Sequence, residues 1–192
     1  MRNQQALEFL RARRSVPAAQ LQAPGPTPAE LREIVATAIR VPDHGKLAPW
    51  RLIAFTGDAG ARYGQALADL HVRVDPGVPA VKLAKDRGRF AHSPVVLAVV
   101  ARIDAEHPKI PAQEQLLSAG CLGFNLLLAA QAAGFAAQWL TGWSCYERAA
   151  AALLGLADDE RAIGYIHIGS RGTEPPERNR PDVEQVLGDW QG

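Results

Sequence analysis

The apolar run from Pro94 to Ala101 constrains the fold of this chain more than any other segment. The run is continuous and rich in β-branched residues, and it lacks the alternation expected of a strand with one solvated face. Such a run is typical of a strand that is covered on both faces. Residues 94–101 are therefore predicted to form a strand buried on both faces.

Helices outweigh strands in the rest of the chain. Helices are predicted over residues 4–13, 28–41, 59–73, 111–134 and 147–155, with a further helical piece that ends near residue 90. Strands are predicted over residues 50–56, 94–101, 135–140 and 164–169, with a loop over residues 16–26 and a short helix near residues 183–190. Because the two kinds of element do not alternate regularly, the pattern favours an α+β domain over a doubly wound parallel sheet. No internal repeat or linker is visible, so residues 1–192 are predicted to form one domain.

The clearest helix start is the tetrapeptide Thr27-Pro28-Ala29-Glu30. Thr27 suits the N-cap, Pro28 suits the first helical position, and Glu30 completes a capping box. Pro42 ends the same helix, because the residue before a proline avoids helical geometry.

The composition is that of a folded chain without a strong global charge. Of the 192 residues, 47% are hydrophobic and 21% are charged, which allows a substantial core. The net charge of +1 does not favour nucleic acid as a partner. The longest apolar stretch, Leu116 to Ala137, contains polar residues and glycines, and it predicts a buried core helix rather than a membrane span. No secretory signal is recognisable, so a cytoplasmic protein without a membrane partner is expected.

Histidines and cysteines do not form a metal-binding pattern, and no metal is expected. Cys121 lies in an apolar stretch and is expected to be a small buried hydrophobe. His167 lies on a predicted strand and is expected to be structural. Residues 120–123 are within a helical run and do not form a dinucleotide-binding fingerprint, and residues 144–145 lack the nucleophile elbow of a hydrolase.

Two short segments carry the groups best suited to binding a ligand. Arg13, Arg14 and Ser15 end the first helix, and a proline-braced loop after the second helix contains Arg40 and His44. A guanidinium presents a fixed fork of donors that suits a phosphate or the edge of a ring, and rigid loops often carry binding groups. The simpler alternatives are an arginine pair that complements a helix dipole and a stiff loop that enters a strand.

Together, these segments resemble the flavin-contacting segments of the FMN-dependent nitroreductase family, in particular its short bacterial NAD(P)H nitroreductase branch. The most specific part is Arg40-x-Pro-Asp-His44 followed by Pro49-Trp50. The resemblance extends from about Leu7 to Trp190. It implies a central mixed or antiparallel sheet flanked by helices, in a homodimer that holds FMN in clefts between its subunits.

The resemblance also implies which residues contact the cofactor. Arg13 and Ser15 are expected to reach the phosphate and the pyrimidine side of FMN, and Arg40 and His44 to touch the flavin. Asp43 is a candidate to orient His44. The full set of predicted FMN-binding residues is Arg13, Arg14, Ser15, Arg40, His44, Trp139, Leu140, Thr141, Arg178 and Arg180.

Two parts of that set come from the second half of the chain. The backbone of Trp139, Leu140 and Thr141 is expected to run along the reactive edge of the flavin; position 140 holds an arginine in some relatives, so only a backbone contact is inferred there. Arg178 and Arg180, with Arg180 preferred, are candidates for the phosphate. The C-terminal segment 171–192 is expected to wrap the partner subunit.

The implied activity is electron transfer from NADH or NADPH through FMN to an electron-poor acceptor, such as a nitroaromatic or a quinone. The chemistry would belong to the flavin, which the protein holds and tunes. Arg13, Arg40 or His44 is expected to stabilise the negative charge of the reduced flavin. Three alternatives remain open: an FMN carrier or interaction protein with little turnover, an FMN-dependent dehydrogenase or flavin-degrading enzyme on the same fold, and an α+β domain without a cofactor.

Overall fold

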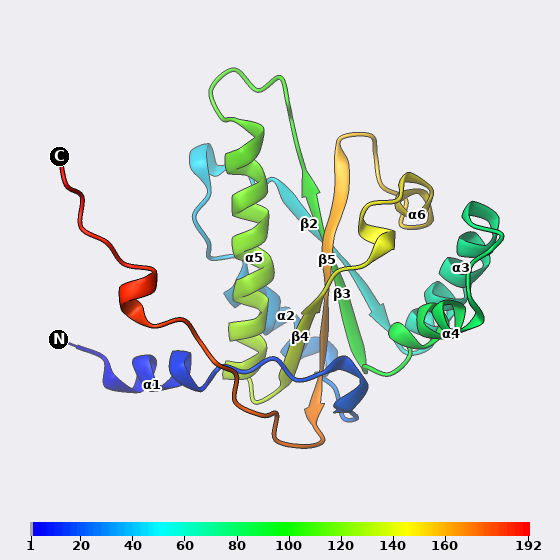
Figure 1. Cartoon of the computed structure of the whole chain (residues 1–192), viewed down its shortest axis with the longest axis horizontal. Coiled ribbons are helices and arrows are strands. Elements are labelled where there is room, and N and C mark those ends of the chain that lie inside the picture. The colour runs from blue at the N-terminus through cyan, green and yellow to red at the C-terminus, as the bar shows by residue number, and fades with distance from the viewer. Residues whose placement is uncertain (1) are drawn as a thin grey trace.

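A pair of long antiparallel strands, β3 and β5, forms the middle of the sheet (Figure 1). The computed structural model describes residues 2–192. The strands are β1 (Leu21–Gln22), β2 (Trp50–Thr56), β3 (Val95–Arg102), β4 (Ala136–Leu140) and β5 (Glu160–Arg171). The helices are α1 (Gln4–Ala12), α2 (Pro28–Ala38), α3 (Ala59–Val74), α4 (Ala80–Arg89), α5 (Ala112–Ala132) and α6 (Arg148–Leu153), with 3-10 turns η1 (Ala18–Gln20), η2 (His44–Lys46), η3 (Trp143–Cys145) and η4 (Val183–Gln185).

All pairings in the sheet are antiparallel. The order is β1-β5-β3-β2, and β4 also pairs with β5. The α+β prediction is therefore confirmed, and of the two expected kinds of sheet the antiparallel one is observed.

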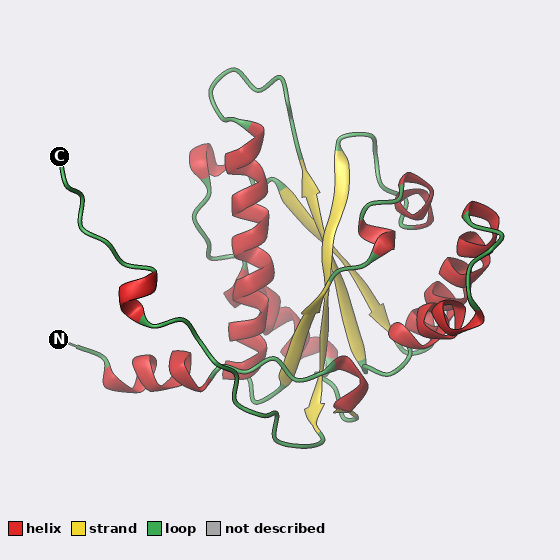
Figure 2. Ribbon diagram, in the orientation of Figure 1, coloured by secondary structure: helices red, strands yellow, loops and turns green. Residues whose placement is uncertain are grey.

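Helices cover both faces of this sheet (Figure 2). On one face, α2 and α5 pack on β3 through a cluster that includes Ile34, Leu97 and Leu122. On the other face, α3, α6 and the end of α4 pack through a second cluster that includes Leu67, Phe90 and Tyr165. Because β3 lies between the two clusters, the side chains from Val95 to Ala101 are all nearly fully buried, as the unbroken apolar run predicts.

The predicted helix starts and ends follow local chemistry. The hydroxyl of Thr27 accepts a hydrogen bond from the backbone N–H of Glu30, and the Glu30 carboxylate accepts one from the backbone N–H of Thr27. The capping box is therefore confirmed. Gly155, just after α6, has a φ of 63°, the left-handed conformation in which glycine commonly ends a helix.

The sequence prediction is wrong about β1 and about the length of β5. β1 lies inside the predicted loop 16–26, where prolines hide a two-residue strand that exists only because it pairs with Ser170 and Arg171. β5 begins at Glu160 rather than at Gly164, because its first residues pair with the end of β3. Both errors arise because these strands are defined by pairing with distant segments, and the local sequence pattern does not show which segments pair.

Cys121 is exposed, which corrects the expectation that it is a buried hydrophobe. It lies on the outer side of α5 with Leu117 and Phe124, which are 60% and 48% exposed. α5 is apolar on both its sheet-facing and its outer sides, so composition alone does not tell which residues are covered. α5 is long and apolar enough to cross a membrane by length and composition, and half of that stretch is buried inside the fold.

Glu160 ties three neighbouring strands together at one end of the sheet. Its carboxylate accepts hydrogen bonds from Arg51 of β2, at 2.7 Å, and from Arg102 of β3, at 2.9 Å. The Arg51 hydrogen bonds, followed by that of Arg102, lower the pKa of Glu160 to about 2. The Glu160 side chain is 7% exposed, so solvent screens its attraction to the two arginines only in part.

Glu160→Gln is expected to remove a pH-dependent part of the stability. Because the pKa of Glu160 is lower in the folded chain than its ordinary value of 4.5, its contribution is complete above that pH and is lost as pH falls toward 2. Denaturant titrations should give a free energy of unfolding that falls over this range by on the order of 2 kcal/mol more in the wild type than in the variant. Asp158→Asn, which removes an exposed carboxylate, is the control. Equal pH dependence in wild type and Glu160→Gln would contradict this assignment.

Candidate functional site

Four arginines from the two ends of the chain lie together. Arg13 and Arg14 follow α1, and Arg178 and Arg180 belong to the C-terminal segment, which crosses the end of α1 (Figure 1). We call these four residues the arginine cluster. They line a surface cavity of about 490 Å³ with Leu10, Arg11 and Glu177. The glutamate pairs with Arg14, so the cavity keeps a large excess of positive charge.

Arg13 is the most constrained member of the arginine cluster. Burial, and then repulsion by Arg180, Arg14 and Arg178, lowers the pKa of its guanidinium. No carboxylate pairs with Arg13 among the described residues, and its one side-chain hydrogen bond, at 3.4 Å, goes to the hydroxyl of Ser15. Positive groups held together in this way favour a bound anion, because an anion relieves their repulsion. The predicted residues Arg13, Arg14, Ser15, Arg178 and Arg180 are thus brought together.

The segment after the arginines runs along β4. The backbone N–H of Val16 donates to the carbonyl oxygen of Ala137 at 3.2 Å. The backbone N–H of Ala18 donates to the side-chain oxygen of Gln138 at 2.6 Å. These bonds lead the chain from the arginine cluster to the wall of a second cavity.

This second cavity, the β4 cavity, has a volume of about 460 Å³. Its walls come from the start of η1, from the last turns of α4 and from the end of β4. The lining residues are Pro17, Ala18, Ala19, Ala84, Lys85, Gly88, Arg89, His92, Gln138, Leu140 and Thr141. The set combines apolar surface with three basic side chains and contains no carboxylate.

Lys85, Arg89 and His92 were missed by the sequence analysis. Lys85 and Arg89 are four positions apart, which places them on one side of α4, and His92 follows three positions after Arg89, beyond the end of the helix. The i, i+4 spacing of the first two could have identified them. The Arg89 guanidinium donates to the carbonyl oxygen of Thr141 at 3.0 Å and so joins α4 to the end of β4.

Trp139 presents only its backbone to this side of the sheet. Its ring lies on the opposite face, between α5 and β5, where a Cβ on Gly123 or Gly164 would come within 2.6 Å or 1.9 Å of the ring. Leu140 and Thr141 line the β4 cavity directly. A backbone contact from these three residues, as predicted, is compatible with this arrangement.

The loop with Arg40 and His44 is held by a different carboxylate from the one expected. The Asp43 side chain accepts hydrogen bonds from the backbone N–H groups of Leu47, at 3.1 Å, and Ala48, at 2.9 Å. His44 Nδ1 instead pairs with Glu114 of α5 at 2.7 Å. The expectation that Asp43 orients His44 is therefore wrong: Asp43 shapes the loop, and Glu114 orients the histidine.

Arg40 and His44 do not lie with the other predicted residues within one chain. The side chain of Gln131 donates to the carbonyl oxygen of Phe9, which places α1 beside the C-terminal end of α5. His44 is beside Glu114, near the N-terminal end of the same helix. These two α5 residues are 17 positions apart in the sequence, which corresponds to about 26 Å along a helix. In Figure 1, the light-blue turn that contains His44 lies beside the upper part of α5, and α1 lies near its lower end.

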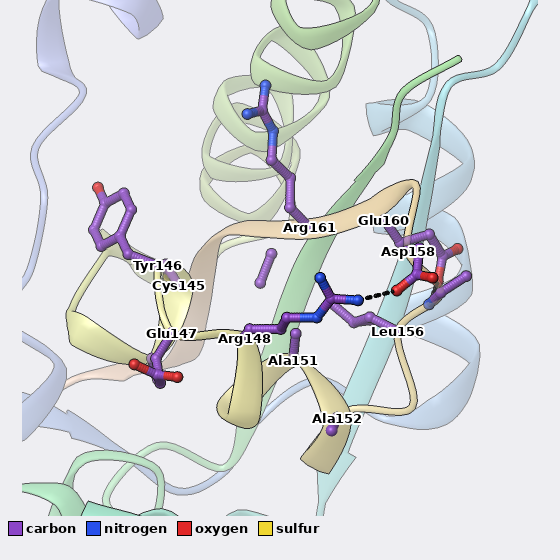
Figure 3. A pocket seen from close by; sticks show the side chains of 13 residues that line it. Cys145, Tyr146, Glu147, Arg148, Ala151, Ala152, Leu156, Asp158, Glu160 and Arg161 are labelled. Atoms are coloured by element: carbon purple, nitrogen blue, oxygen red, sulfur yellow. Dashed lines mark hydrogen bonds and ion pairs between the residues drawn. The ribbon is translucent and has the colours of Figure 1, made fainter. Parts of the chain in front are cut away.

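A third cavity, of about 340 Å³, contains none of the predicted residues (Figure 3). It lies between η3, α6 and the start of β5, and charges of both signs line it. Arg148 pairs with Asp158 there. Burial raises the pKa of the Cys145 thiol, so this cysteine is protonated and is a poor nucleophile. The balanced charge makes this cavity a weaker candidate than the β4 cavity.

Comparison with known proteins identifies the family. The model of the nitroreductase family matches residues 10–170. The chain belongs to the nitroreductase family. It is 37% identical over 173 residues to a Haemophilus influenzae protein named "Putative NAD(P)H nitroreductase", covering 90% of this chain and 91% of that protein. It is 30% identical over 165 residues to YdjA of Escherichia coli K12, which has the same name, covering 86% and 87% of the two chains.

Solved structures agree with this fold. A nitroreductase-like protein from Bacillus cereus superposes with a TM-score of 0.82 at 20% identity, over 100% of this chain and 99% of that one. A variant of NfnB from Sphigopyxis sp. strain HMH, described as an FMN- and NADPH-dependent nitroreductase, superposes with a TM-score of 0.75 at 22% identity, over 97% and 99%. The predicted nitroreductase-like fold is confirmed, and the family membership makes this nitroreductase an oxidoreductase.

Asp43→Ala is expected to destabilise the loop of this nitroreductase. The loop holds Lys46 and Ala48 at φ values of 57° and 47°, which are unfavourable for residues with a side chain. Loss of the two hydrogen bonds that hold this conformation should lower the free energy of unfolding by about 1–3 kcal/mol. Ala48→Gly should have the opposite effect, because glycine adopts a positive φ without strain. A chemical denaturation series that finds Asp43→Ala as stable as the wild type would contradict this role.

Proposed function

We propose that this nitroreductase binds FMN and uses NADH or NADPH to reduce electron-poor acceptors, such as nitroaromatics and quinones. One observation carries the proposal. A cluster of arginines with little compensating charge is joined, by residues 15–18, to a partly apolar cavity without carboxylates. A phosphate suits the first site, and a flat, polar-edged ring suits the second.

The donor set fits FMN in both parts. Guanidinium groups bind phosphate through paired hydrogen bonds, and a phosphate beside Arg13 would offset the repulsion within the arginine cluster. In the β4 cavity, Leu140 offers an apolar surface, and Gln138 and the backbone of Thr141 offer polar groups for a ring edge. When bound, FMN would accept a hydride from the nicotinamide and pass electrons to the acceptor. The described residues would bind it, orient it and tune its charge.

The names of the relatives support the same reading. The two relatives at 37% and 30% identity are named for NAD(P)H and nitroreduction, and NfnB is described as dependent on FMN and NADPH. Both cysteines are free, which suits the reducing cytoplasm where we place the enzyme. An FMN carrier with little turnover would share the binding site but would not consume NAD(P)H.

We further propose that the active form is a homodimer. Arg40 and His44 lie too far from the arginine cluster to act with it in one chain, so the Arg40 and His44 of a second copy would complete each site. Three exposed features are consistent with a subunit interface. α1 has no buried residue, the outer side of α5 is apolar, and the C-terminal segment exposes Val183, Val186, Leu187 and Trp190. In this proposal, residues 1–192 form one domain whose segment 171–192 wraps the partner.

Arg13→Ala is expected to weaken FMN binding by about 10- to 150-fold, because it removes charge-assisted hydrogen bonds worth about 1.5–3 kcal/mol. Flavin fluorescence titration measures the affinity, and Arg32→Ala, on the exposed side of α2, is the control.

In the wild type, NADH or NADPH added without oxygen should bleach the flavin absorbance. Bound flavin that does not bleach would favour the carrier, and a chain that takes up no FMN would refute the proposal.

Mixing two inactive variants tests whether each site is shared between subunits. Arg13→Ala and His44→Ala are each expected to impair FMN binding when alone. After joint unfolding and refolding, about half of the dimers should be mixed, and each should contain one intact site, or about a quarter of all sites. Recovery of tight FMN binding near that level is the expected result. No recovery would mean that Arg13 and His44 act within the same chain. Tight FMN binding by His44→Ala alone would mean that His44 is outside the site.

A further inference from the structure

Basic residues on α4 and just after it give the β4 cavity a positive charge that the chain does not neutralise. Lys85, Arg89 and His92 line the cavity, no carboxylate lines it, and none of the three is in an ion pair within residues 2–192. Positive charge in a partly buried cavity stabilises negative charge more effectively than it would in open water. The arrangement therefore favours a ligand that is anionic or becomes anionic.

Arg89 is the best placed of the three basic groups. It is half-buried, whereas Lys85 and His92 are exposed. Its Nη1 donates to the carbonyl oxygen of Thr141, which leaves most of its five N–H donors free for a ligand. Gly142 makes room for it, since a Cβ at that position would lie only 2.2 Å from Arg89 Nη1. The guanidinium is thus held against the backbone at the end of β4.

A buried carboxylate holds α4, and with it Arg89, in position. Asp86 is 5% exposed. It accepts a hydrogen bond from Trp143 Nε1 at 3.0 Å and pairs with His71 Nδ1 at 2.6 Å. These contacts tie α4 to α3 and to η3, one turn of helix before Arg89. The basic side of α4 is therefore fixed relative to β4.

The charge of Arg89 also acts beneath the cavity. Burial, and then Arg89 and His92, lowers the pKa of His167 to about 4, so this histidine is neutral near pH 7. His167 lies directly opposite Gln138 in the β4–β5 pairing and is fully buried. The neutral histidine adds no positive charge of its own, which leaves Arg89 as the inner cation of the cavity.

We propose that Arg89 stabilises the reduced form of the flavin ring and so sets its redox potential. This inference rests on the proposed function. A hydride from NAD(P)H leaves the nicotinamide oxidised and adds two electrons and one proton to the ring, whose net charge falls by one until a second proton arrives. The Arg89 guanidinium offsets that added negative charge. Arg13 then serves the phosphate, and the charge-stabilising role expected of Arg13, Arg40 or His44 passes to Arg89.

The redox potential of the bound flavin tests this role without measuring turnover. Arg89→Gln should weaken the binding of reduced FMN about tenfold more than that of oxidised FMN, which lowers the potential of a two-electron couple by about 30 mV. Arg89→Lys keeps the charge and should stay close to the wild type. Arg87→Gln removes an exposed charge from the same helix outside the cavity and should leave the potential unchanged.

A second variant covers the case in which Arg89→Gln does not retain FMN. Gly142→Ala keeps every charge but places a Cβ where the Arg89 guanidinium lies, so it should displace the guanidinium and lower the potential in the same direction. A wild-type potential in whichever of the two variants binds FMN would overturn the inference and leave Arg89 with a structural role. A wild-type chain that binds no FMN would refute the proposed function itself, and the role of Arg89 would fall with it.

Discussion

The antiparallel pairing of β3 with β5 is the interaction on which the rest of the structure depends. β3 is buried on both faces, so it requires a helical layer on each side, and β5 in turn carries β4 and β1 on its other edge. The end of β4 therefore lies between the layer that contains α4 and the segment that follows α1. Glu160 of β5 accepts hydrogen bonds from Arg51 of β2 and Arg102 of β3, and so links these three strands at one end of the sheet. The β4 cavity exists because these pairings bring three distant segments to one place.

Uncompensated positive charge is the second organising feature. Around Arg13 and around Arg89 the chain gathers basic groups with almost no nearby carboxylate. Burial, and then repulsion by its arginine neighbours, lowers the pKa of Arg13. In the third cavity, by contrast, charges of both signs occur, and Arg148 pairs with Asp158. An arrangement that costs free energy in the isolated chain is understandable if a bound anion offsets it. The excess of positive charge, rather than the cavity volume, distinguishes the candidate site from the third cavity.

Elements that depend on local chemistry could be predicted from the sequence. The capping box at Thr27 and the apolar run of β3 act over a few residues, and both are observed as expected. The prediction was wrong where a distant contact decides. Cys121 is exposed because α5 turns its other side to the sheet, and His44 pairs with Glu114 because α5 passes beside η2. Lys85 and Arg89 of α4, and His92 just after it, were missed because a basic helix face is usually only a solvated surface, and nothing local indicates that β4 ends beside it.

The sequence by itself determined the fold class, the family and the separate groups suited to a flavin: the arginines after α1, the backbone after Trp139 and the arginines of the C-terminal segment. Only the tertiary structure decided which of these groups meet. It brings Arg13 and Arg180 to one cavity, adds Arg89 to the next, and keeps His44 near the far end of α5. The physical reason is that a rigid helix of 21 residues separates the two ends of the predicted site by a length that no side chain spans.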